Sequence, residues 1–258
     1  MRLARVAHPE GVAFVQVDGR EGAETAREIE DHPFGNPTFT GRSWPLADTR
    51  LLAPILPSKV VAIGRNYADH AAELGNDVPS SPIIFIKPST SVIGPRVPIQ
   101  LPASSERVDY EGELAVVIGK KAKHLTEANA MSCVFGYTIG NDVSERTWQK
   151  ADRGLWRSKN ADTFKPMGPW IETDVDLDKM ETVIRVNGNE TGRFHTNDMI
   201  FGVVPFLVEL SKYFTLSPGD VIWMGTDGAS PNLKAGDVVE IDITGIGTLR
   251  NRFVAEKV

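Results

Sequence analysis

Short apolar runs separated by polar and turn residues dominate the chain. In the larger, C-terminal part these runs are rich in Val and Ile, which favours strands. They lie at 60–64, 83–87, 114–118, 134–139, 182–188, 221–225 and 238–243. Apolar residues recur at helical spacing over 201–214, and a second, shorter helix is predicted over 68–74. Because the strands do not alternate regularly with helices, we predict a mainly β fold with a few helices rather than a doubly wound parallel sheet.

The first 55 residues have a pattern of their own. An apolar run at 12–17 before Asp18-Gly19 predicts a strand and a hairpin turn. Residues 24–30 suggest a short helix, and loop residues then lead to Pro54 and Pro57. We therefore expect a small N-terminal α+β domain at 1–55 and a larger domain at 56–258.

Composition and charge argue against several classes of function. The 258 residues carry a formal net charge of −6, and Lys and Arg are scattered, so nothing indicates nucleic-acid binding. The single cysteine, Cys133, excludes an internal disulfide and fits a reducing cytosol. We expect no signal peptide, and no run approaches the ~20 apolar residues of a membrane span. A cytoplasmic protein is therefore expected.

Two glutamates one residue apart, Glu111 and Glu113, give the strongest chemical signal. They directly precede the apolar run at 114–118. On a strand both side chains point to one side, where two like charges repel unless a cation lies between them. The spacing therefore indicates a divalent metal site. A solvated polar face on an edge strand would give the same pattern.

A third carboxylate, Asp142, follows the strand predicted at 134–139. Ligands are often presented at strand ends, although a simple turn residue would look the same. Together with Glu111 and Glu113 it offers only carboxylate oxygens, which suit Mg²⁺, Mn²⁺ or Ca²⁺ better than zinc or copper. Three such ligands would leave room for waters and a chelating substrate.

An imidazole and a carboxylate, His70 and Glu73, share one face of the helix predicted at 68–74. The carboxylate would raise the basicity of the imidazole, as a general base requires. Gly64 and Gly75 flank the segment and could be hinges of an active-site lid. A routine polar pair on a surface helix is the alternative.

Two lysines and a glycine-containing turn are further candidates. Lys159 could stabilise an enolate or a carboxylate, and Lys87 could face the same site, although such lysines are more often solvated. The segment Gly225-Thr226-Asp227-Gly228 follows an apolar run and could bind an anion through its amides and hydroxyl.

Several longer motifs span the region from about Lys59 to the C-terminus. They are Gly64-Arg65-Asn66-Tyr67-Ala68-Asp69-His70, Phe85-Ile86-Lys87-Pro88-Ser89, Asp109-Tyr110-Glu111-Gly112-Glu113-Leu114, Gly136-Tyr137-Thr138-Ile139-Gly140-Asn141-Asp142, residues 164–169, and Gly245-Ile246-Gly247-Thr248-Leu249-Arg250-Asn251. In content and order they resemble the fumarylacetoacetate hydrolase family. The resemblance implies a mixed β-sandwich roll, a smaller N-terminal domain and a homodimer.

The same resemblance implies roles for individual residues. It implies Mg²⁺ or Mn²⁺ held by Glu111, Glu113 and Asp142. The catalytic groups that it implies are His70, Glu73 and Lys159. The residues that it implies for substrate binding are Arg65, Arg146, Gln149 and Thr226.

One departure from the family concerns the loop after Thr226. The family usually has a proline after this threonine, and this chain has Asp227. The loop loses a rigid element and gains a negative charge. That charge should disfavour a substrate carboxylate at this point unless a Lys or Arg offsets it.

The family's chemistry implies an enolate formed from a 2-oxo or 2-hydroxy acid. Our first expectation is an isomerase acting on 5-carboxymethyl-2-hydroxymuconate or 2-hydroxyhepta-2,4-diene-1,7-dioate. Acylpyruvate hydrolysis and oxaloacetate decarboxylation are alternatives, because they share the same enolate. Outside catalysis, the chain could be a silent 2-oxo-acid binder, or its carboxylates could hold a structural Ca²⁺.

Overall fold

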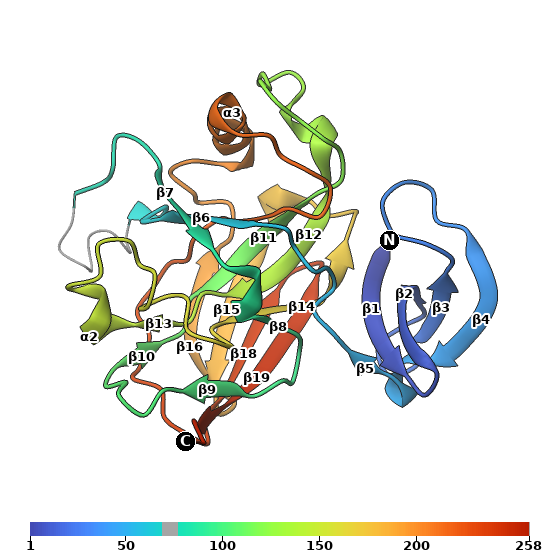
Figure 1. Cartoon of the computed structure of the whole chain (residues 1–258), viewed down its shortest axis with the longest axis horizontal. Coiled ribbons are helices and arrows are strands. Elements are labelled where there is room, and N and C mark those ends of the chain that lie inside the picture. The colour runs from blue at the N-terminus through green and yellow to red at the C-terminus, as the bar shows by residue number, and fades with distance from the viewer. Residues whose placement is uncertain (69–76, 258) are drawn as a thin grey trace.

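Strands dominate the computed structural model, which describes residues 1–68 and 77–257 (Figure 1). The largest sheet has the order β4-β3-β2-β1-β14-β12-β11-β17-β6-β7, with β5 beside β1 and β8 beside β14. Its N-terminal strands are β1 (Arg2–His8), β2 (Gly11–Asp18), β3 (Thr25–Ile29), β4 (Phe39–Pro45) and β5 (Arg50–Leu51). The others are β6 (Val60–Gly64), β7 (Ile83–Lys87), β8 (Val92–Ile93), β11 (Gly112–Ile118), β12 (Val134–Asn141), β14 (Lys165–Glu172) and β17 (Val221–Trp223).

A second sheet faces the first across the main core. Its order is β16 (Asn189–His195), β15 (Glu181–Val186), β18 (Val238–Ile243), β19 (Gly247–Ala255) and β9 (Ile99–Leu101). The short strands β10 (Val108–Asp109) and β13 (Ser144–Glu145) pair with each other. Among the described residues, the helices are α2 (Arg146–Gln149) and α3 (Val203–Tyr213), and the 3-10 turns are η1 (Leu46–Asp48), η2 (Ser89–Ser91), η3 (Ala130–Cys133) and η4 (Leu177–Lys179). No helix among the described residues is long and apolar enough to cross a membrane.

The central strand β11 is buried on both faces. Leu114 and Val116 belong to the main core together with Ile184 of the second sheet. Ala115 and Val117 belong to a second apolar cluster on the other side. Each buried Leu, Ile or Val side chain contributes about 1.5–3 kcal/mol, so this strand is firmly anchored. The acidic residues at its start are therefore held on a rigid support.

The N-terminal strands form an antiparallel meander at one side of the molecule, drawn in blue in Figure 1. Val6, Val15 and Ala26 form their own small core. This meander joins the main body through β1 and β14, where Leu3 lies opposite Ile171.

The mainly β fold with a few helices is confirmed. The helix predicted over 201–214 is also present as α3. The helix expected over residues 24–30 is wrong, because this segment forms β3 between β2 and β4. Ala26 and Glu28 are buried there, and Glu28 accepts hydrogen bonds from Thr40 and Arg42 of β4. Pairing on both edges outweighs the local helical preference. Apart from Ala68, the helix predicted over 68–74 lies outside the described residues.

Candidate metal and substrate site

The three predicted carboxylates meet where β11 begins and β12 ends. Glu111 directly precedes β11, Glu113 is its second residue, and Asp142 follows β12. The two strands are antiparallel, with Glu113 opposite Gly140, so the start of one lies against the end of the other. Each carboxylate is buried and offers one oxygen, and these oxygens lie within 4.8 Å of one another.

Backbone hydrogen bonds hold this acidic cluster in place. The amide of Asp142 donates to the carbonyl oxygen of Glu111 at 2.9 Å. The amide of Gly225 donates to Oε2 of Glu113 at 2.8 Å. Gly225 has φ +88, and a Cβ there would lie 3.0 Å from the Cβ of buried Asn66. A glycine therefore suits this turn, which carries the chain past Glu113.

Three lysines surround the carboxylate of Asp142. Lys165 contacts its Oδ1 at 2.5 Å, while Lys87 and Lys159 contact Oδ2 at 2.5 and 3.1 Å. Lys87 is 1% exposed and Lys165 is 0% exposed. Lys87 is thus a buried part of the site rather than a solvated strand end. Lys165 was missed from the sequence, although its place between Phe164 and Pro166 in an apolar run is a usable signal.

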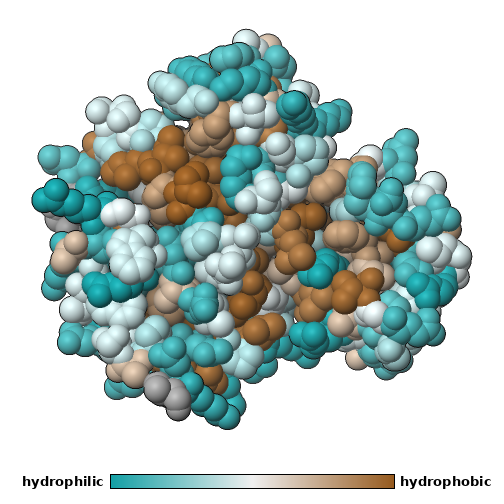
Figure 2. All heavy atoms as spheres, in the orientation of Figure 1, coloured by the Kyte–Doolittle hydropathy of each residue, from teal (hydrophilic) through white to brown (hydrophobic). Residues whose placement is uncertain are grey.

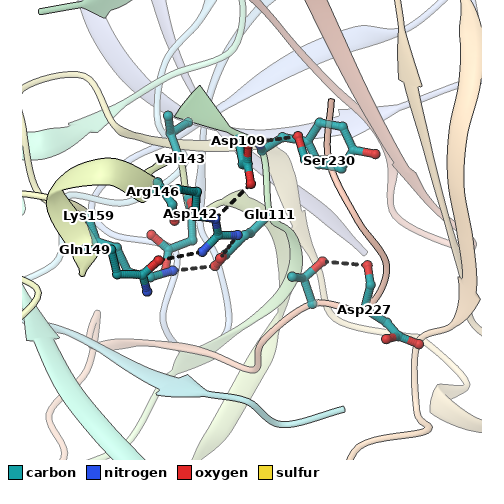
Figure 3. A network of polar contacts seen from close by, with 12 residues as sticks. Asp109, Glu111, Asp142, Val143, Arg146, Gln149, Lys159, Asp227 and Ser230 are labelled. Atoms are coloured by element: carbon teal, nitrogen blue, oxygen red, sulfur yellow. Dashed lines mark hydrogen bonds and ion pairs between the residues drawn. The ribbon is translucent and has the colours of Figure 1, made fainter. Parts of the chain in front are cut away.

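A second group of contacts links Glu111 to α2 (Figure 3). Arg146 lies 2.7 Å from Oε1 of Glu111 and donates at 2.8 Å to Asp109 and at 2.9 Å to Gln149. Glu145 positions this helix, because its carboxylate accepts from the amide of Trp148 in the first turn. Asp109 was also missed from the sequence, because its contact with Arg146 forms only when β10 and α2 come together.

Burial and charge shift the pKa values of the cluster in opposite directions. Burial, reinforced by the charge of Asp142, raises the pKa of Glu113 to about 8. Burial would also raise the pKa of Asp142, but the charges of Lys159, Lys165 and Lys87 lower it below its ordinary value. Burial lowers the pKa of Lys165 well below the usual range of a lysine. The cluster therefore combines a carboxyl that retains its proton easily with one that loses it easily.

A cavity of about 840 Å³ opens beside the cluster. It is lined by the residues expected to contact substrate, Arg65, Arg146, Gln149 and Thr226, and by Glu111 and Lys159. The hydroxyl of Thr226 donates to the carbonyl oxygen of Asp227 at 3.4 Å, and Oδ1 of Asp227 is buried with no hydrogen-bond partner in the described structure. The hydroxyl of Thr226 is thus directed to its own loop. His70 and Glu73 lie outside the described residues.

The donor set fits a hard divalent cation. Glu111, Glu113 and Asp142 supply only carboxylate oxygens, which Mg²⁺ and Mn²⁺ prefer, and they converge on one point. A dication there also offsets the repulsion among three buried carboxylates. Fold and site together define a β-rich protein with a cavity and an acidic centre able to hold a divalent metal ion.

Comparison with known proteins identifies the family. Residues 59–254 match the fumarylacetoacetate (FAA) hydrolase C-terminal family, and residues 1–54 match the family Rv2993c-like, N-terminal. The chain belongs to the fumarylacetoacetate hydrolase family, as its motifs indicated.

Among similar structures are two isomerases. 5-Carboxymethyl-2-hydroxymuconate delta-isomerase from Mycobacterium smegmatis is 50% identical with a TM-score of 0.93, covering 99% of this chain and 100% of that one. 2-Hydroxyhepta-2,4-diene-1,7-dioate isomerase from Mycobacterium marinum is also 50% identical with a TM-score of 0.93, and both chains are fully covered, at 100%.

Two more distant relatives bear on the chemistry. Mitochondrial oxaloacetate tautomerase fahd2 from Xenopus laevis is 42% identical over 92% of this chain and 76% of its own. Maleylpyruvate hydrolase from Sphingobium sp. SYK-6, in complex with manganese (II) ion and pyruvate, is 26% identical with a TM-score of 0.81, and 100% of each chain is covered. The expected activities, isomerase and hydrolase, thus both occur among the relatives of this chain.

Proposed function

We propose that this chain is a Mg²⁺- or Mn²⁺-dependent isomerase of 2-hydroxy-dienedioic acids such as 5-carboxymethyl-2-hydroxymuconate or 2-hydroxyhepta-2,4-diene-1,7-dioate. The observation that carries the proposal is the convergence of Glu111, Glu113 and Asp142 within 4.8 Å beside a cavity. The names of the two relatives at 50% identity support this substrate class.

Each side chain has a role in this proposal. Glu111, Glu113 and Asp142 would hold the metal ion, which when bound supplies Lewis-acid stabilisation of negative charge on a substrate oxygen. Lys159 lines the cavity, so its ammonium group stabilises enolate charge from the protein side. Arg65, Arg146, Gln149 and Thr226 are proposed to orient the substrate. His70 and Glu73 are proposed to move the proton between two carbons.

Isomerisation ranks above the alternatives because it needs only proton movement. Relatives named as isomerases and as an oxaloacetate tautomerase, at 42% identity or above, carry out such proton shifts. Acylpyruvate hydrolysis and oxaloacetate decarboxylation require a C–C bond to break as well. The manganese-bound maleylpyruvate hydrolase, at 26% identity, keeps hydrolysis as the second candidate.

Three further proposals concern the molecule as a whole. Residues 1–55 and 56–258 are proposed as two domains, supported by the separate apolar core of the first strands. Limited proteolysis near Pro54 should then separate two fragments, and cuts elsewhere alone would argue against the division. A cytoplasmic location is supported by the single cysteine, and fractionation of the cell would test it. The third proposal is a homodimer.

The decisive experiment measures metal binding and turnover together. We expect the protein loaded with Mg²⁺ or Mn²⁺ to isomerise 5-carboxymethyl-2-hydroxymuconate faster than it turns over acetylpyruvate or oxaloacetate. The Glu113→Gln variant should lose most of its metal affinity by calorimetry, and its turnover with it. The control Glu127→Gln changes the same charge at an exposed site and should behave as the unmodified protein.

Two results would contradict the proposal. Hydrolysis of acetylpyruvate without any turnover of the diene would reverse the ranking of isomerase and hydrolase. Binding of a 2-oxo acid without turnover of any of these compounds would make the chain the silent binder considered from the sequence.

A further inference from the structure

The wall of the cavity carries an excess of positive charge in a chain whose formal net charge is −6. The basic residues that line it are Arg65, Arg107, Arg146, Lys150, Arg153 and Lys159. Arg146 and Lys159 are ion-paired with the acidic cluster, and Arg107 lies 3.2 Å from a carboxylate oxygen of Asp109. These three are therefore already balanced by the protein.

Lys150 and Arg153 differ from these paired groups. Both are exposed, and neither has an ion-pair partner among the described residues. Lys150 follows Arg146 by four residues at the end of α2, and Arg153 follows Gln149 by four residues in the succeeding turn. All four line one cavity. Because Arg146 contacts Glu111 while Lys150 and Arg153 reach solvent, the segment runs from the acidic cluster to the mouth of the cavity.

The turn that carries Arg153 is firmly held. The adjacent Asp152 is 6% exposed, and its carboxylate accepts from the amides of Arg157 and Ser158 at 2.9 and 2.8 Å. The lining of the same cavity also includes the apolar side chains of Phe85 and Leu155. The cavity thus combines an acidic cluster, exposed positive charge and apolar surface, which suits a ligand with two charged ends and an apolar middle.

We infer that Lys150 and Arg153 form a second anion site, which binds the far carboxylate of a substrate whose 2-oxo or 2-hydroxy acid end lies at the acidic cluster. This inference rests on the proposed function and adds the residues that select a dicarboxylate. Thr226 is the less suitable partner for that carboxylate, because its hydroxyl is bonded within its own loop and the charge of Asp227 is adjacent.

The test compares two compounds that differ only at the far end. 2-Oxoadipate and 2-oxohexanoate have the same chain length, and only the first has a second carboxylate. We expect the Mg²⁺-loaded protein to bind 2-oxoadipate about tenfold more tightly in calorimetry, as charge-assisted hydrogen bonds at a partly exposed site allow. The Lys150→Gln/Arg153→Gln double variant should reduce this preference to within about twofold, with its affinity for 2-oxohexanoate unchanged.

The matched control is Arg20→Gln/Lys121→Gln, which removes two exposed positive charges that do not line the cavity. It should keep the preference for 2-oxoadipate. Circular dichroism melting curves check that both double variants fold. Because binding is measured, the result does not depend on finding the physiological substrate.

The outcomes separate this inference from the function on which it rests. Equal binding of both compounds by the unmodified protein would overturn the second anion site and leave the metal-centred function standing. A preference that survives in the Lys150→Gln/Arg153→Gln variant would assign the far carboxylate to other residues. Binding of neither compound would instead contradict the proposed function, and the second anion site would fall with it.

Discussion

Asp142 shows how a single residue depends on charges supplied by distant parts of the chain. Its partners Lys87, Lys159 and Lys165 come from β7, from the segment after α2 and from β14. Removing an ion from water costs several kcal/mol, so three buried ammonium groups persist only where carboxylates and carbonyl oxygens balance them. Lys165 also donates to the carbonyl oxygens of Val143 and Phe164, at 3.1 and 2.9 Å. It therefore ties the end of β12 to β14.

At the residue scale, we predict that Lys165→Met destabilises the metal-free protein. Loss of the ammonium group leaves Oδ1 of Asp142 against an apolar chain, which costs roughly 3 kcal/mol in the free energy of unfolding. Urea denaturation with a chelator present measures this. The exposed Lys121→Met serves as control and should leave the midpoint unchanged. If both variants unfold at the same urea concentration, Lys165 does not balance the charge of Asp142.

The β11–β12 strand pair and the turn after α2 bring the residues of the site together. Each is held in place by its own hydrogen bonds. The register of β11 and β12 places Glu113 opposite Gly140, which brings Glu111 and Asp142 to the same end of the sheet. The turn after α2 carries Lys159 toward them, and Asp152 organises this turn by accepting from Trp156, Arg157 and Ser158. No cation pairs with Asp152 in the described part of the chain, so main-chain amides and a hydroxyl balance its charge.

At the element scale, Asp152→Asn should loosen the turn that carries Lys159. An amide cannot accept all of these hydrogen bonds, so we expect a loss of about 1–3 kcal/mol in the free energy of unfolding at pH 7. Turnover should fall as well, because Lys159 would no longer be held at the cluster. The control Asp162→Asn removes an exposed carboxylate near by and should change neither quantity.

The loss of stability caused by Asp152→Asn should depend on pH in a defined direction. Burial acts to raise the pKa of Asp152, but the hydrogen bonds from Ser158, Arg157 and Trp156 outweigh it and lower the pKa below 3.8. The stabilisation is therefore complete above that ordinary value and disappears as the pH falls through the lower, folded-state pKa. Urea denaturation at a series of pH values should show that the free energies of unfolding of the unmodified protein and of the Asp152→Asn variant converge at low pH. A difference that grows as the pH falls would contradict this assignment.

Among the described residues, β7 presents an apolar strand edge that no other strand covers. In the described part of the chain, β7 pairs only with β6 and ends the large sheet. Its side chains Ile83, Ile84 and Ile86 are 39%, 37% and 53% exposed, and Figure 2 shows hydrophobic surface on this side of the molecule. Soluble proteins usually protect such edges with charge or cover them. We propose that a second copy of the chain covers this edge in a homodimer.

At the whole-molecule scale, Ile86→Lys should convert this dimer into a monomer. A lysine at this position would bury an unpaired ammonium group in the apolar β7 interface. The free-energy cost of removing that charge from water should exceed the free energy gained by association. Sedimentation velocity measures the change. Val12→Lys, at a similarly exposed position on β2, should leave the dimer intact. A monomeric unmodified protein, or a dimeric Ile86→Lys variant, would exclude β7 as the interface.

Several central strands and the acidic residues of the cluster could be predicted from the sequence. The apolar runs at 60–64 and 83–87 coincide with β6 and β7, because a short run rich in β-branched residues between turn residues has few other stable conformations. The one-residue spacing of Glu111 and Glu113 likewise indicates a divalent metal site without any further information. Both patterns lie within a short stretch of sequence, so they can be interpreted without knowledge of the rest of the chain.

The tertiary structure alone decided which residues contact the acidic cluster and which secondary structure residues 24–30 adopt. The sequence does not show that Lys87 and Lys165 contact Asp142, because the packing of β7 and β14 around this carboxylate buries both lysines. Residues 24–30 have helical composition, but pairing with β2 and β4 makes them a strand. The physical reason is common to both: burial and sheet pairing depend on contacts between segments far apart in sequence, and no local pattern records them.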